Sequence, residues 1–166
     1  AVAAPAAAGE IACRFEAGVV VVPAEMAGIG GDYILDTGTA QSALHQTRAE
    51  TEGIVGTDLS GEVRLAGQSV ATLSLKVVDL DVRTWNLPTP VAGVIGADVL
   101  KTFVVDVRFA PCRVRVSTSA QAPRFAGRGL DLAWDLGRPT TLDAASDDAH
   151  EVSGPFVIAT GANAPV

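Results

Sequence analysis

An aspartate, a threonine and a glycine stand directly after an apolar segment, in the run Ile34-Leu35-Asp36-Thr37-Gly38-Thr39. A carboxylate at the end of an apolar strand lies in a dry environment, which is costly unless the group has partners or a chemical role. The glycine permits a sharp turn and the close approach of another chain or a ligand. The hydroxyl of Thr37 can fix that turn by hydrogen bonding. Asp36 is therefore the first candidate for acid–base chemistry.

A second block with related character lies downstream, in the sequence Gly-Val-Ile-Gly-Ala-Asp-Val-Leu at 93–100. Its apolar part predicts a buried strand over 91–95, and Gly96 opens a short helix over 97–101. Asp98 falls in the first turn of this helix, where free N–H groups and the helix dipole stabilise a carboxylate. We interpret Asp98 as structural and not catalytic.

The segments before Asp36 predict a β-hairpin that carries this residue at its tip. The β-branched run 19–22 is typical of a strand, 27–31 is a glycine-rich turn, and 32–36 is the returning strand. Further on, residues 43–52 tolerate one or two helical turns.

Later segments predict more strands and turns. The apolar alternation over 69–82 changes face near 77–78, which predicts a bulge or a change of sheet. Residues 103–107 and 113–116 predict a hairpin. A turn between two extended stretches is indicated by Thr57, Asp58, Leu59, Ser60 and Gly61.

Together the two blocks resemble the retropepsin-like aspartic peptidases of the bacterial secreted or periplasmic type. Lobes of that family carry an Asp-Thr-Gly loop and then an apolar-apolar-Gly strand that leads into a short helix. The resemblance covers about 17–116, or one lobe. It implies an all-β fold with one short helix, and an aspartic-type endopeptidase with Asp36 as catalytic carboxylate, its loop shaped by Thr37 and Gly38. It also implies that the turn at 57–61 is the substrate-binding flap.

Asp-Thr-Gly also closes ordinary turns in other β-domains, and that interpretation stays open. A repeat adds to the family resemblance, because 31–39 can be laid over 154–162 at a constant offset of 159 − 36 = 123 residues. Ala159 then stands where Asp36 stands in the first copy. We interpret this as the start of a second, homologous lobe; a chance Thr-Gly in an alanine-rich tail is the alternative. The predicted division is a leader with the first-strand entry (1–16), a lobe (17–117), a linker (118–128) and a partial second lobe or hairpin extension (129–166).

Peptide hydrolysis by such an enzyme needs two carboxylates that share one proton across a water. One acts as general base while the other polarises the scissile carbonyl. Asp36 supplies one carboxylate, so the other must come from a homodimer mate or from a second lobe. If Ala159 holds the second position, the chain is inert and binds peptide at most. The competing hypothesis is a non-catalytic domain that binds a peptide or protein by strand addition.

The composition of the chain argues against several other classes of function. Nineteen acidic against twelve basic residues give a net charge of −7, which argues against a nucleic-acid partner. No apolar run reaches membrane-spanning length. The two histidines, His45 and His150, do not form a zinc-binding motif with cysteines, so no metal and no organic cofactor are predicted.

The two cysteines, Cys13 and Cys112, stand at the two ends of the predicted lobe. They could close it as a disulfide, or they could be two unrelated buried thiols. A bridge would indicate an oxidising compartment, that is, the periplasm or the exterior. The alanine-rich start of the chain resembles a leader exposed after signal-peptide removal.

Overall fold

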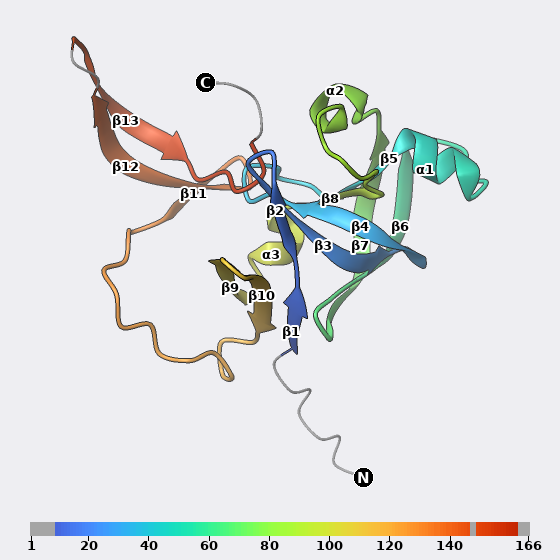
Figure 1. Cartoon of the computed structure of the whole chain (residues 1–166), viewed down its shortest axis with the longest axis horizontal. Coiled ribbons are helices and arrows are strands. Elements are labelled where there is room, and N and C mark those ends of the chain that lie inside the picture. The colour runs from blue at the N-terminus through green and yellow to red at the C-terminus, as the bar shows by residue number, and fades with distance from the viewer. Residues whose placement is uncertain (1–8, 147–148, 163–166) are drawn as a thin grey trace.

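The structure is a computed structural model that describes residues 9–146 and 149–162. Strands dominate it and the helices are short, so the chain is all-β as predicted (Figure 1). None of the helices in these ranges is long and apolar enough to span a membrane. The helices are α1 (Gln46–Thr51), α2 (Asp81–Thr84) and α3 (Ala97–Leu100). The strands are β1 (Gly9–Ala12), β2 (Arg14–Glu16), β3 (Val19–Met26), β4 (Ile29–Leu35), β5 (Ala43–His45), β6 (Asp58–Leu65), β7 (Gln68–Val78), β8 (Gly93–Ile95), β9 (Val104–Phe109), β10 (Cys112–Ser117), β11 (Ala133–Asp135), β12 (Arg138–Ser146) and β13 (Glu151–Val157).

Six strands close into a barrel in the order β3-β4-β8-β5-β7-β6, because β6 also pairs with β3. Strand β4 runs parallel to β8, with Leu35 opposite Ile95. Parallel strands end at the same edge of a sheet. The residues that follow these two strands, Asp36 and Gly96, therefore leave the barrel side by side.

The run of valines in β3 is explained by burial on both faces of the strand. Val20 and Val22 belong to the larger apolar cluster of the core. Val19 and Val21 point the other way and join the smaller cluster with Ile34. Strands buried on both faces carry continuous apolar runs and not an alternating pattern. The hairpin that carries Asp36 is thus anchored on both sides.

A second sheet has the order β1-β10-β9, and a disulfide joins Cys112, the first residue of β10, to Cys13, which lies between β1 and β2. The predicted bridge is therefore present in the structure. The range 1–16, predicted as a leader with the first-strand entry, contains β1 and β2 from Gly9 onward, and Ile11 packs against the larger core cluster. The rest of that leader lies outside the described residues.

The third sheet, β11-β12-β13, extends from one end of the molecule, after the long connection that follows β10 (Figure 1). Strands β12 and β13 pair in register, with Thr141 opposite Phe156. Much of this sheet is open to solvent; Leu142, for example, is 83% exposed. The hairpin leads into 159–161 in the same way that β3 and β4 lead into 36–38.

Two local predictions are wrong. The expected turn at 57–61 is mostly strand, since 58–61 form the first half of β6 and pair with 73–76 of β7. Their polar side chains resemble a turn in sequence because they lie on the exposed side, where Asp58 pairs with Lys76. The bulge or change of sheet expected at 77–78 is also absent from the described strands, because β7 pairs with β6 up to Lys76 and with β5 over 76–78 of the same sheet. The face change there marks the end of β7, and the register shift lies instead at 61–63.

Candidate active site

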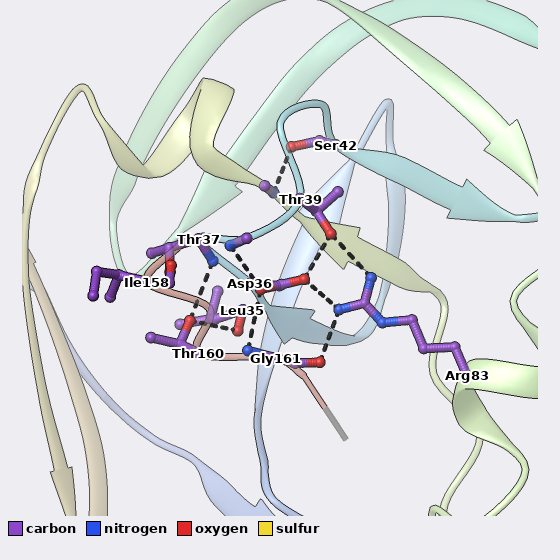
Figure 2. A network of polar contacts seen from close by, with 11 residues as sticks. Leu35, Asp36, Thr37, Thr39, Ser42, Arg83, Ile158, Thr160 and Gly161 are labelled. Carbon is purple, nitrogen blue, oxygen red and sulfur yellow. Dashed lines mark hydrogen bonds and ion pairs between the residues drawn. The ribbon is translucent and has the colours of Figure 1, made fainter. Parts of the chain in front are cut away.

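The loop that follows β4 crosses the loop that follows β13, and each holds the other through a threonine (Figure 2). The hydroxyl of Thr37 donates to the carbonyl of Ile158, and the hydroxyl of Thr160 donates to the carbonyl of Leu35 at 3.1 Å. The main-chain N–H of Thr37 donates to Thr160 Oγ1 at 3.2 Å. Each threonine thus binds the carbonyl two residues before the other threonine. We call this pair of bonds the threonine clasp.

The glycines of the two loops permit this close crossing. A Cβ atom added to Gly161 would lie 2.5 Å from the Cβ of Asp36. A Cβ atom added to Gly38 would lie 2.6 Å from the Cβ of Ala159. Both distances are shorter than carbon atoms tolerate, so each position requires glycine. The relation is reciprocal, and Ala159 occupies in one loop the place that Asp36 occupies in the other.

The carboxylate of Asp36 lies in this crossing, 4% exposed as a residue. Its Oδ1 accepts the main-chain N–H of Gly38 at 2.8 Å and that of Gly161 at 3.1 Å. Its Oδ2 accepts the hydroxyl of Thr39 at 2.6 Å and Nη2 of Arg83 at 2.5 Å. Arg83 also donates to the carbonyl of Gly161 at 2.9 Å, so it joins both loops.

These contacts fix the charge of Asp36. Burial on its own would raise the pKa of this carboxyl. The hydrogen bonds from Thr39, Arg83 and Gly38, together with the charge of Arg83, outweigh burial and lower the pKa below its ordinary value. The ionised carboxylate therefore stabilises the fold at pH values above the ordinary pKa of an aspartate. This contribution is lost as the pH falls through the lowered pKa that Asp36 has in the folded protein.

Replacing Arg83 tests this account of the charge. In Arg83→Gln, we expect the pKa of Asp36 to rise, because the positive charge is lost while burial remains. Carbon-13 NMR titration of the Asp36 carboxyl measures the shift directly. Arg64→Gln is the control, since Arg64 pairs with Glu25 and Glu62 on the surface. An equal Asp36 titration in parent and Arg83→Gln would contradict the ion pair.

The loop after Asp36 is fastened to α3. Asp98 accepts the main-chain N–H of Ser42 at 2.9 Å and its hydroxyl at 2.6 Å. The same hydroxyl accepts the N–H of Gly96 at 2.9 Å. Asp98 thus has the structural role that its place in the helix predicted.

Asp36 opens onto a cavity of about 770 Å³. The segment Asp79–Trp85 forms part of its wall, with Val82 88% and Trp85 84% exposed. The remaining lining comes from Gly38, Arg138, Val157, Ala159, Gly161 and Ala162. The predicted flap at 57–61 is not among the lining residues, whereas Thr57 lines a separate cavity beside α1. A second cavity, of about 600 Å³ and largely apolar, reaches Ala159 from between β9 and β11.

Sequence reasoning predicted Asp36, Thr37 and Gly38, and the structure brings them together with Ala159 as the 123-residue offset suggests. It missed Arg83, which lies 47 residues from Asp36 in a short helix. No pattern around Arg83 distinguishes it from a surface arginine. Only the folding of α2 against the mouth of the barrel brings it to the carboxylate.

No protein-family model matches this chain, and no curated protein sequence matches it. Among solved structures, the chain is similar to a retropepsin-like aspartic protease from Rickettsia conorii. The two share 16% sequence identity with a TM-score of 0.47, over 65% of this chain and 90% of the other.

Proposed function

We propose that this chain is an aspartic-peptidase-type domain whose peptide-binding centre is the crossing of the loops 36–38 and 159–161. Asp36 is the one catalytic-type carboxylate of this centre, and Ala159 stands at the place of the second. In this form the domain binds an extended peptide without cleaving it. The observation that carries the proposal is the threonine clasp, which presents positions 36 and 159 in equivalent settings beside one cavity.

The absence of hydrolysis follows from the chemistry of the two positions. Alanine has no proton to share, and Asp36 is ionised and paired with Arg83. Asp36 could act as the base toward a water between the two positions, but position 159 offers no acid to polarise the scissile carbonyl. The centre can still accept a peptide, because Val82 and Trp85 offer exposed apolar surface at its edge.

The clasp within one chain favours a second lobe over a homodimer as the source of the missing carboxylate. In a homodimer, two copies of Asp36 would have to meet, but loop 159–161 already fills the place opposite Asp36. We therefore propose the lobe at 17–117, the linker at 118–128 and a degenerate second lobe from 129. The disulfide supports a periplasmic or secreted location.

Binding and cleavage by the parent chain test this function. We expect some members of a library of fluorescent octapeptides to bind, as measured by fluorescence polarisation, and none to be cleaved, as measured by mass spectrometry. Val82→Asp should weaken binding by about tenfold, which corresponds to about 1.4 kcal/mol. Val55→Asp is the matched control, because Val55 is 97% exposed and lines a different cavity.

Three results would count against the proposal. If no peptide binds, the centre is not a peptide site. If Val82→Asp and Val55→Asp bind equally well, the cavity at Asp36 is not the place of binding. Cleavage by the parent that disappears in Asp36→Asn would show that two copies of Asp36 meet and that the dimeric arrangement is correct.

A further inference from the structure

We infer that His45, Asp79 and Asp81 form a binding site for a divalent cation, with Zn²⁺ as the ion that fits best. One ligand atom from each of the three side chains lies within 4.8 Å of the other two. Nε2 of His45 is 3.1 Å from Oδ1 of Asp81. The second histidine, His150, lies far from these three residues in sequence, and no sequence motif predicts the cluster. The fold assembles them where β5 ends and α2 begins.

His45 is the fixed member of this set. It is the last residue of β5, which lies between β7 and β8 in the barrel. The residue is only 9% exposed, so its imidazole has little freedom to turn away. Nδ1 is buried without a hydrogen-bond partner in the described part of the chain, and Nε2 is the nitrogen that faces the carboxylates. The protein thus orients a buried imidazole toward two acids.

Asp79 and Asp81 are the adaptable members, since both lie at the surface. The side chain of Asp81 is 73% exposed. The N–H of Asp81 donates to Oδ1 of Asp79 at 2.8 Å, which holds the two carboxyl groups near each other. A cavity of about 290 Å³ is lined by both His45 and Asp81, whereas Asp79 lines the cavity at Asp36. The open side leaves room for water to complete the coordination of an ion.

The chemistry of the donors selects the ion. Imidazole together with carboxylates suits Zn²⁺, whereas Ca²⁺ and Mg²⁺ prefer oxygen ligands throughout. Zinc ligands at about 2.0–2.2 Å from the metal lie roughly 3.3–3.5 Å apart in tetrahedral geometry. The His45–Asp81 separation is close to that spacing, and a rotation of the exposed Asp79 carboxylate brings in the third ligand. The ion's two positive charges would offset the two carboxylates.

Such an ion would also fix α2. Asp79 and Asp81 precede Arg83 in the same short segment, and Arg83 contacts Asp36. A cation bound to His45 would therefore fasten this segment to the rigid end of β5. Asp79 also lines the cavity at Asp36, but zinc binding is measured without peptide, so the inference stands or falls independently of the function proposed above.

Zinc titration of the full chain, prepared without a polyhistidine tag, tests the inference. Isothermal titration calorimetry with zinc chloride should give one ion per chain and a rise in melting temperature on saturation. His45→Ala and Asp81→Asn should each weaken zinc binding at least ~10-fold. His150→Ala is the matched control and should bind as the parent does, because His150 lies outside the cluster.

Several outcomes would overturn the site. These are the absence of saturable zinc binding to the parent, unchanged binding in Asp81→Asn, and a loss of binding in His150→Ala alone. Equal affinity for calcium chloride would overturn the assignment of zinc. If His45→Ala fails to fold, as judged by circular dichroism, Asp81→Asn decides the question, since that side chain is exposed and the change preserves its shape.

Discussion

The substitution Ala159→Asp is expected to give this chain peptidase activity roughly 10²–10⁴-fold above that of the parent, which is the usual contribution of general acid–base catalysis. The Cβ of Ala159 already has the same relation to Gly38 that the Cβ of Asp36 has to Gly161. A carboxylate added at 159 would therefore lie beside the Asp36 carboxylate and share one proton with it. Cleavage of a fluorogenic peptide that binds the parent chain measures the gain.

Arg83 sets the pH range of that activity. It stabilises the negative charge of Asp36, so the pair of carboxylates keeps its shared proton only at lower pH. Adding Arg83→Gln to Ala159→Asp should move the acidic carboxyl titration, and with it the bell-shaped profile, toward higher pH. The two apparent pKa values of that profile belong to the pair of carboxylates and not to either residue.

Two variants decide whether the gained activity has this origin. Ala159→Asn introduces a side chain of the same size as aspartate but without an acidic group, and this variant should remain inactive. Asp36→Asn combined with Ala159→Asp should lose the gained activity. Activity that survives Asp36→Asn would remove Asp36 from the mechanism, and an inactive but folded Ala159→Asp that still binds peptide would show that the two positions do not form a dyad.

Loss of the disulfide is expected to have the largest effect on stability. The bridge joins residues 99 positions apart, and a closed loop of that size contributes about 4–5 kcal/mol in the chain-entropy model. Cys13→Ser combined with Cys112→Ser should lower the free energy of unfolding by about this amount. Urea unfolding followed by circular dichroism measures it, and the parent chain treated with a reductant should show the same loss. A change below about 1 kcal/mol would contradict the prediction.

The parts of the fold that could be predicted from sequence are those fixed by neighbouring residues. The valine run and the glycine-rich turn indicate the hairpin that carries Asp36, and β3 and β4 form it. The position of Asp98 at a helix start indicates its structural role, which its bonds to Ser42 bear out. The hairpin follows from local composition, whereas the bonds of Asp98 to Ser42 span 56 residues and could not themselves be predicted from its place in the helix.

The features that sequence reasoning missed arise from contacts between distant segments. Arg83 reaches Asp36, and His45 reaches Asp81, only because the barrel brings β4, β5 and α2 to one edge. The composition of 57–61 predicts a turn because its polar residues lie on the exposed side of β6. Local composition does not distinguish an exposed strand from a loop when the partner strand lies further along the chain.

The threonine clasp relies on hydroxyls and main-chain carbonyls, and position 159 contributes to the crossing through its Cβ alone. The crossing of the two loops therefore does not depend on whether position 159 carries a carboxylate. Because two of the four alanine codons differ from an aspartate codon only at the second base, a single nucleotide exchange at such a codon would convert a binding centre into a catalytic one, or the reverse, while the folded framework stays the same.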